Sequence, residues 1–200
     1  MGLLSTLFGR TKLKAPNRDR FFSIVTAADS LRGRTDIRPS DHAGIVFNPV
    51  ESTFFENMDA ELRELLRISG RSTGTRFEIK DDSFGTRWVV LDDRDFDDLV
   101  TTIHLISETI HEHGFADRIL AAVFKFHADG RDVYWIYNYK RGRFYPLILS
   151  GHQQRDNAAE MRMGTVMEEE KIPVERSLER WYDRVIAALE EALEGAPPDA

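Results

Sequence analysis

The chain contains 200 residues, of which 42% are hydrophobic, and its 27 Lys and Arg against 34 Asp and Glu give a formal net charge of −7. This length and hydrophobic content are enough for one sizeable core. The acidic balance argues against a dominant nucleic-acid-binding surface, which is normally basic. The absence of cysteine excludes disulfides, cysteine metal ligands and thiol catalysis, and it is consistent with a reducing cytoplasm.

The first forty residues are basic and irregular, and we expect residues 1–40 to form an arm with room for one helix. Near the start, an apolar group is followed by a basic group, a combination typical of short segments that lie on anionic lipid. The apolar residues are Leu3, Leu4, Leu7 and Phe8, and the basic ones are Arg10, Lys12 and Lys14. No run approaches the roughly 18 consecutive apolar residues of a membrane span, so membrane contact through this segment would be weak and reversible.

Two segments in the first half of the chain have the apolar spacing of amphipathic helices. The first begins at a capping box formed by Thr53 and Glu56 and is closed by Gly70. Its apolar face consists of Phe55, Met58, Leu62 and Leu65. The second follows the acidic run at 92–98, where the helix dipole favours anions, and it ends at Gly114. Its apolar face consists of Phe96, Leu99, Ile103, Ile106 and Ile110.

Several other segments have the residue pattern of antiparallel strands. Because Pro146 cannot donate a backbone hydrogen bond, the last of these strands should be an edge strand or carry a bulge. We expect a strand over 43–50 that Pro49 ends, a hairpin over 75–91, and a meander over 119–126, 132–139 and 144–149.

A polar linker and a short helix over 157–170 follow the meander, and a final helix begins near residue 174. The apolar face of that last helix consists of Leu178, Trp181, Val185, Leu189 and Leu193. The order helix, strands, helix, strands, helix predicts an α+β fold, in which an antiparallel sheet made of hairpins and a meander packs with helices. We assign residues 41–195 to a single domain and residues 196–200 to a disordered tail.

Residue types that often carry chemistry have structural explanations here. His104, Glu108 and His111 share one face of the second helix beside its apolar stripe, and we interpret them as a solvated flank. The acidic pairs at 81–82 and 92–93 fall in a turn and at a helix start, where such residues form backbone hydrogen bonds.

The sequence contains no Gly-rich phosphate loop, no G-x-S-x-G elbow and no H-E-x-x-H motif. We therefore predict no catalytic, cofactor-binding or metal-ligating residues and no enzymatic activity. Histidines and carboxylates can nevertheless converge in space without a local signature, so a small-ligand pocket or an unrecognised hydrolase site stays an alternative.

The stretch YWIYNYKRGRFYPL, residues 134–147, has a first strand with no polar face. Trp135, Tyr137 and Tyr139 are expected on one side of this strand, with Tyr134 and Ile136 on the other. An antiparallel strand normally exposes one face to water. Either helices therefore cover both faces, or one face meets a partner.

At the tip of this hairpin, Lys140, Arg141 and Arg143 form a positive rim, and Arg155 and Asp156 are expected to pair near it in charge-assisted contact. Aromatic anchors beside arginine are enriched at protein interfaces, and we favour an interaction surface over a core hairpin. The predicted partner-binding residues are Tyr137, Tyr139, Lys140, Arg141, Arg143, Phe144, Tyr145, Arg155 and Asp156. An RNA-recognition motif would need an aromatic residue where Arg143 follows the glycine, so we predict no nucleic-acid partner.

Over residues 1–185 the chain resembles the PspA-associated protein family PspAB. The resemblance is strongest in the run from Lys140 to Pro146, followed by residues 155–157. The segments that carry it are MGLLSTLFGRTK, AGIVFNPVES, DDSFGTRWVVLDD, DFDDLVTTIH, YKRGRFYPL and QRDNAAEM.

The resemblance implies a cytoplasmic component of a phage-shock-type membrane-stress response, with a PspA-like protein or an HtpX-type membrane metalloprotease as partner and no cofactor. The element order is also similar to that of type III secretion chaperones and YbjN-like proteins, which hold partner proteins. We therefore expect a non-enzymatic adaptor or chaperone-like protein that binds its partner, or a second copy of itself, through residues 134–157. The alternatives are a peripheral protein of the inner membrane surface that uses its N-terminal segment, and a small-ligand-binding module.

Overall fold

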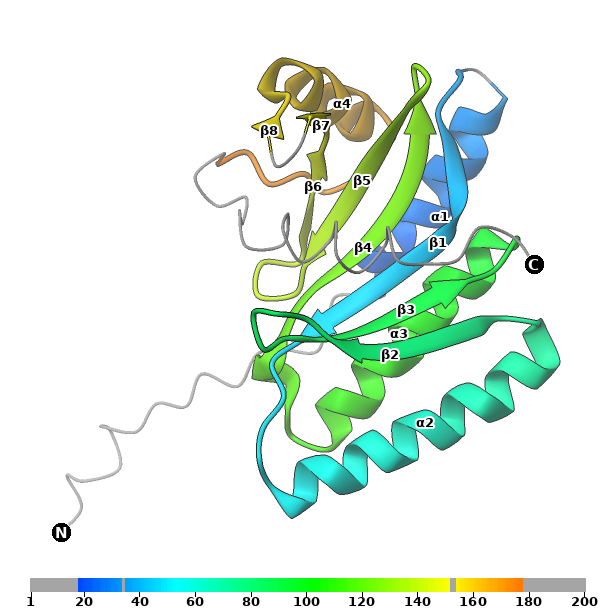
Figure 1. Cartoon of the computed structure of the whole chain (residues 1–200). Coiled ribbons are helices and arrows are strands. Elements are labelled where there is room, and N and C mark those ends of the chain that lie inside the picture. Colours follow the sequence, from blue (N-terminus) through cyan, green and yellow to red (C-terminus); the bar gives the residue numbers. More distant parts are fainter. Residues whose placement is uncertain (1–17, 34, 152–153, 178–200) are drawn as a thin grey trace, which may run out of the picture.

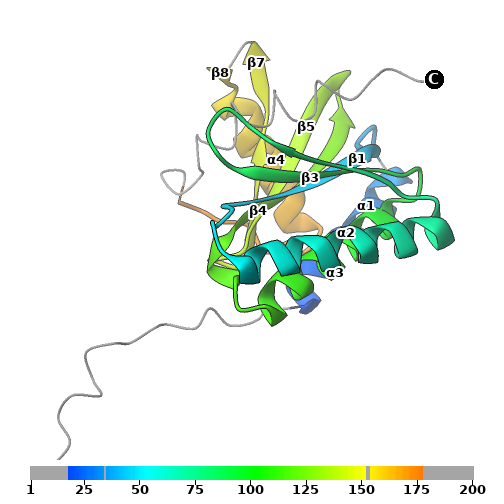
Figure 2. The ribbon, with the colours of Figure 1, turned by 60° about the horizontal axis from the view of Figure 1, so that its bottom comes forward.

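The computed structural model describes residues 18–33, 35–151 and 154–177, which form a six-stranded antiparallel sheet with helices packed against it (Figures 1 and 2). The helices are α1 (Arg18–Arg32), α2 (Thr53–Thr73), α3 (Phe96–Glu112), the 3₁₀ helix η1 (Ala116–Arg118) and α4 (Asn157–Glu169). The strands are β1 (Arg38–Phe47), β2 (Arg76–Asp81), β3 (Arg87–Asp92), β4 (Ile119–Ala128), β5 (Arg131–Asn138), β6 (Arg143–Leu147), β7 (Leu149–Gly151) and β8 (Gln154–Arg155). The predicted α+β class is confirmed.

The strand order β2-β3-β1-β4-β5-β6 places β1 between the β2–β3 hairpin and the β4–β5–β6 meander. A separate two-stranded ladder is formed by β7 and β8. The β4–β5 turn contains Asp129 and Gly130, both with positive φ, at 52° and 71°, as a tight hairpin turn requires. β6 is an edge strand of the sheet, as expected from Pro146.

Residues 18–32 belong to the core, so the prediction of an N-terminal arm is wrong for this part of the chain. α1 carries apolar residues at helical spacing, and they are at most 1% exposed. The charged residues between them conceal this pattern in the sequence. The buried residues of α1 are Phe21, Ile24, Ala27, Ala28 and Leu31.

The start of α2 differs by one residue from the predicted capping box. The N-cap is Ser52, whose hydroxyl accepts a hydrogen bond of 3.2 Å from the backbone N–H of Phe55. Thr53 is instead the first helical residue. Serine and threonine are both good N-cap residues, and the sequence alone did not separate these neighbours.

α2 also continues past Gly70, where the sequence predicted its end, and stops before Gly74 at φ 92°. Gly70 is needed inside the helix because a Cβ atom there would lie 2.5 Å from the carbonyl oxygen of Thr75. The buried stripe accordingly ends with Leu66 in place of the predicted Leu65.

α3 follows the prediction closely. Asp95 caps its start by accepting a hydrogen bond of 2.9 Å from the backbone N–H of Asp97. The predicted apolar stripe is buried to within 2% of full burial. It packs against the same core as α1 and α2, on one face of the sheet (Figure 2).

The two faces of β5 are both buried, and they belong to different clusters. Trp135 and Tyr137 point into the main core with the helices. Tyr134 and Ile136 point to the opposite face, as their alternation predicted, and join a second cluster. We call this cluster the outer band; it comprises Val46, Trp88, Val90, Ala121, Val123, Tyr134, Ile136, Tyr145 and Leu147.

Two predicted features lie outside the described residues: the apolar and basic stretch from Leu3 to Lys14 and the apolar stripe of the final helix from Leu178 to Leu193. The predicted start of that helix near residue 174 is wrong, because Val174 bridges to Phe144 on β6 and residues 174–177 are not helical. Across the described residues, no helix is long and apolar enough to cross a membrane.

Candidate partner-binding groove

The chain that follows α4 runs along the outer edge of β6. The backbone N–H of Phe144 donates to the carbonyl of Pro173 at 2.8 Å, and the N–H of Glu175 donates to the carbonyl of Phe144 at 2.7 Å. Backbone groups at a sheet edge otherwise lack strand partners. Residues 173–175 therefore cover part of this edge and fix the end of α4 against β6.

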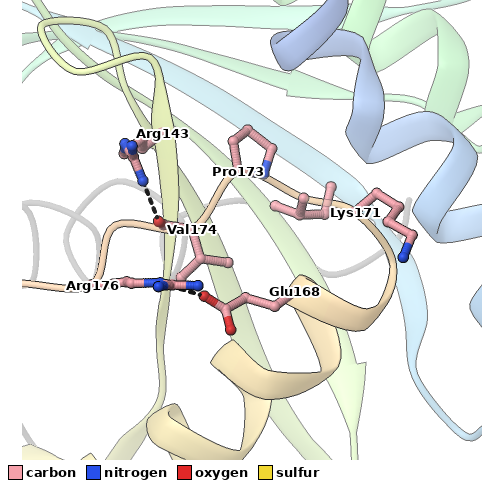
Figure 3. Close-up of a pocket in the computed structure, with 7 residues that line it drawn as sticks. Arg143, Glu168, Lys171, Pro173, Val174 and Arg176 are labelled. Atoms are coloured by element: carbon pink, nitrogen blue, oxygen red, sulfur yellow. Dashed lines mark hydrogen bonds and ion pairs between the residues drawn. The ribbon is translucent and has the colours of Figure 1, made fainter.

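An open groove of about 740 Å³ lies where α4, the segment after it and β6 meet (Figure 3). Ile172 and Val174 are 3% and 7% exposed, so they anchor this segment to the core. Charged side chains stand around them. The lining residues are Arg143, Glu168, Lys171, Ile172, Pro173, Val174 and Arg176.

Two hydrogen bonds order the groove. Arg143 donates from Nη1 to the carbonyl oxygen of Val174 at 3.0 Å. Arg176 donates from Nε to Oε1 of Glu168 at 3.0 Å, and both dashed contacts are drawn in Figure 3. The side chain of Arg176 is 82% exposed, so this second contact is a surface ion pair of small energetic value.

The groove and the adjoining β5–β6 turn carry an excess of positive charge. The cations are Lys140, Arg141, Arg143, Lys171 and Arg176. The anions are Glu168 in the lining, Glu175 with an oxygen 3.9 Å from Nε of Arg141, and Glu169 and Glu170 at the end of α4. A local positive patch on a chain of net charge −7 attracts an acidic partner and steers its approach.

Lys171 has an unfavourable backbone conformation. Its φ is 66°, in the left-handed region, which costs a residue with a Cβ atom roughly 1–2 kcal/mol. It ends α4 with a hydrogen bond from its own N–H to Glu168 and another from Ile172 to Met167, a helix end at which glycine is usual. A lysine here places an ammonium group at the groove at the expense of stability.

Of the nine predicted partner-binding residues, three are exposed at this site. Lys140 and Arg141 lie in the turn, and Arg143 lines the groove. Three others of the nine are aromatic residues buried in the protein's own core, each at most 1% exposed: Tyr137, Phe144 and Tyr145. A partner therefore meets the cationic rim before it could reach these rings.

Tyr139 is half-buried, its hydroxyl oxygen is enclosed, and its ring centroid lies 6.3 Å from that of Phe21 on α1. Burial raises the pKa of Tyr139 above its ordinary value and raises the pKa of Tyr137 to about 12. Among the described residues, the hydroxyl of Tyr137 has no hydrogen-bond partner. Both phenols are neutral at physiological pH.

His104 does not lie on a solvated flank, so that interpretation is corrected. Its ring centroid is 5.1 Å from that of Phe22 and 5.9 Å from that of Phe21, because α1 packs over this side of α3. Burial lowers the pKa of His104. The described residues contain no group of three or more His, Asp or Glu that could hold a metal ion.

Arg155 and Asp156 do not pair near the hairpin rim, and that expectation is wrong. Arg155 binds Glu160 with Nη2 to Oε2 at 2.7 Å. Asp156 caps α4 by accepting from the N–H of Ala159 and also binds Arg131 at 3.0 Å. Arg131 begins β5, at the opposite end of that strand from the rim. The reason is that α4 starts at one end of the meander and ends at the other.

The predicted acidic pairs have structural partners. Burial raises the pKa of Asp82, but hydrogen bonds from the hydroxyl and backbone N–H of Thr86, the indole of Trp88 and the backbone N–H of Phe84 outweigh it and lower the pKa. The other contacts are Asp81 with Arg87, Asp92 with Arg76 and Asp93 with Thr75.

The sequence did not indicate Glu168, Lys171 or Arg176 as site residues. They are separated from Arg143 by 25 residues or more in the numbering and form no local motif. Only the pairing of residues 173–175 with β6 brings them to the rim.

These observations define an α+β protein with a cationic groove at the edge of its sheet. A family model described as PspA associated protein B, PspAB, matches residues 1–187. The chain belongs to this family. No curated protein and no solved structure matches the chain, and the similarity to secretion chaperones therefore stays an analogy of element order.

Proposed function

We propose that this protein is a non-enzymatic adaptor of a PspA-type membrane-stress response and binds a PspA-like protein through the cationic groove. The observation that carries the proposal is the cluster of exposed cations around an open groove on an otherwise acidic protein. The family description, which names association with PspA, supports the choice of partner.

The groove suits an acidic segment of a partner. Arg143 is held in place by its hydrogen bond to Val174, which reduces the entropy lost when it binds a carboxylate. Lys140 and Lys171 have no ion pair with a described residue and are available for carboxylates. Attraction between opposite charges accelerates the association of two proteins, and the affinity it provides falls as the salt concentration rises.

The test is calorimetric titration of the full-length protein with the PspA-like protein of the same cell, at low and high salt. A variant with Lys140→Glu, Lys171→Glu and Arg176→Glu should bind much more weakly while keeping its fold. The matched control carries Arg67→Glu, Arg71→Glu and Arg94→Glu, which are exposed and change the net charge equally. Equal affinity of the two variants would remove the groove from the interface.

The same groove would serve an HtpX-type membrane protease or a second copy of the chain. Titration of the groove variant and its control against the detergent-solubilised protease distinguishes the first case. Molecular mass by light scattering over a range of concentrations distinguishes the second, since a dimer through the groove would dissociate in the groove variant alone.

A second candidate function is contact with the inner membrane surface, which would keep the cytoplasmic adaptor near its partner. It is favoured by the apolar residues Leu3 to Phe8 followed by the basic ones up to Lys14. The test compares the flotation of the native chain with anionic liposomes to that of a double variant carrying Leu4→Asp and Leu7→Asp. Equal flotation of both proteins would exclude this segment.

A further inference from the structure

The outer band runs across the sheet on the face opposite α1, α2 and α3. Its nine residues come from β1, β3, β4, β5 and β6, and each is at most 8% exposed. Aromatic side chains make up a large part of it, with Trp88, Tyr134 and Tyr145 among them. This face of the sheet is therefore as apolar and as well shielded as the core.

The pairing register gives the band its direction. Val90, Gly44 and Val123 lie opposite one another on β3, β1 and β4. Ile136 and Tyr145 continue the same row on β5 and β6. The row crosses five strands, and at ~4.8 Å per strand spacing it is about 19 Å long. A single helix lying across the strands would cover a band of this shape.

No helix of the described residues supplies that cover. All members of the band belong to strands, and the partly buried residues packed against it, Leu120 and Leu149, are not helical either. The described helices contribute their buried residues to the main core on the other face. Large apolar side chains on an uncovered sheet face would be exposed to water, whereas those of the outer band are buried. A further segment therefore has to cover them.

We propose that residues 178–193 of the same chain form an amphipathic helix that lies over the outer band. The described chain reaches Ser177 directly after Glu175 has paired with β6. The described chain therefore ends next to the sheet edge where the row ends in Tyr145. No long connection is required to reach the band.

The sequence of this segment fits the band in length and pattern. Its apolar residues are separated by three or four positions, which places them on one face of a helix. Sixteen residues in a helix extend about 24 Å, enough to cross the row. The apolar face consists of Leu178, Trp181, Val185, Leu189 and Leu193.

The cysteine-free chain permits a thiol-labelling test. Val123→Cys reports on the centre of the band, and Ala122→Cys reports on the main core one position away; both native side chains are fully buried. In the full chain both thiols should react slowly. Adding Val185→Asp and Leu189→Asp should speed labelling at position 123 by more than about tenfold and leave position 122 slow.

The matched control is Ala187→Asp, which adds a carboxylate on the opposite side of the same helix and should leave position 123 protected. Rapid labelling of position 123 in the otherwise native chain would overturn the proposal. Protection that disappears on dilution, together with a dimeric mass, would also overturn it and assign the cover to a second copy.

A second measurement leaves the contacts of the band intact. A nitroxide attached at Ala187→Cys should broaden the methyl signals of Val123 and Ile136 more than those of Ile103 and Ile110 on α3. The reverse order, or no difference, would place the segment elsewhere and overturn the proposal even if the aspartate variants do not fold.

Discussion

Arg155 and Glu160 form an ion pair that ties the start of α4 to the meander. Nη2 of Arg155 lies 2.7 Å from Oε2 of Glu160, whose side chain is 1% exposed, and Oε1 of Glu160 also accepts the backbone N–H of Ile148 at 3.0 Å. These contacts fix the direction in which α4 leaves β8. They therefore determine where the far end of α4, with the groove, meets β6.

Removal of this carboxylate should destabilise the fold strongly. Glu160→Ala removes the buried carboxylate that accepts hydrogen bonds from the Arg155 guanidinium and the Ile148 N–H, and breaking a buried pair in this way costs about 3 kcal/mol. Urea denaturation measures the loss. Glu168→Ala, which removes the exposed partner of Arg176, should cost less than about 1 kcal/mol.

Replacing both residues of the pair by apolar ones distinguishes two causes of the lost stability: the loss of the attraction within the pair, and the burial of a charge without its counter-ion. Arg155→Met with Glu160→Leu should recover a large part of the stability lost in Glu160→Ala, because the largely buried guanidinium is removed together with its carboxylate. If the double variant is as unstable as the single one, the pair stabilises the protein by its own attraction and not by compensating a buried charge.

Two helical glycines should respond in opposite directions to alanine. Gly164→Ala in α4 meets no atom within 4 Å, so the higher helix propensity of alanine should raise the free energy of unfolding by about 0.5–1 kcal/mol. Gly70→Ala in α2 would place a Cβ atom 2.5 Å from the Thr75 carbonyl and should lower it by about 1–3 kcal/mol. Thermal and urea unfolding of both variants checks the pair, and a gain at Gly70 would contradict the close approach.

His104 should make stability depend on pH. Burial lowers its pKa in the folded protein, so below the unfolded value of about 6.5 the unfolded chain binds a proton that the folded chain does not. Stability is therefore present above that pH and is lost as pH falls toward the folded pKa. His104→Phe, which keeps an aromatic ring beside Phe21 and Phe22, should reduce the loss between neutral and mildly acidic pH.

Urea midpoints across that pH range provide the measurement. His127→Gln is the control: His127 lies at the end of β4 with a 54% exposed side chain 2.8 Å from Asp132, so its replacement removes a surface contact and leaves His104 in place. The control should keep the loss of stability seen in the native chain. An unchanged loss in His104→Phe would assign the acid sensitivity to other groups.

Elements with a strong local pattern were predictable from the sequence. The stripe of α3, the three strands of the meander and the edge position of β6 at Pro146 all depend on residues close together in the chain. The alternation that separates Trp135 from Tyr134 was equally local. Such features need no knowledge of distant contacts.

The misjudged features depend on tertiary contacts. α1 is buried because it packs against α3 and the sheet, and the same packing removes His104 from solvent. Asp156 binds Arg131, which is distant in sequence. The groove joins Arg143 to Lys171 only through the pairing of residues 173–175 with β6. The spacing of residues along the sequence does not indicate these long-range contacts.

Lys171→Gly should separate stability from binding. Glycine accepts the φ of 66° without the Cβ penalty, and after its own entropic cost in the unfolded chain the net gain should be about 0.5–1 kcal/mol. The same change removes an ammonium group from the groove, so affinity for the PspA-like partner should fall. The control is Asp129→Gly. Asp129 lies in the β4–β5 turn and also has a positive φ, 52°, and its replacement should leave the affinity unchanged. A more stable Lys171→Gly protein that binds as tightly as the native chain would show that the lysine is not part of the interface.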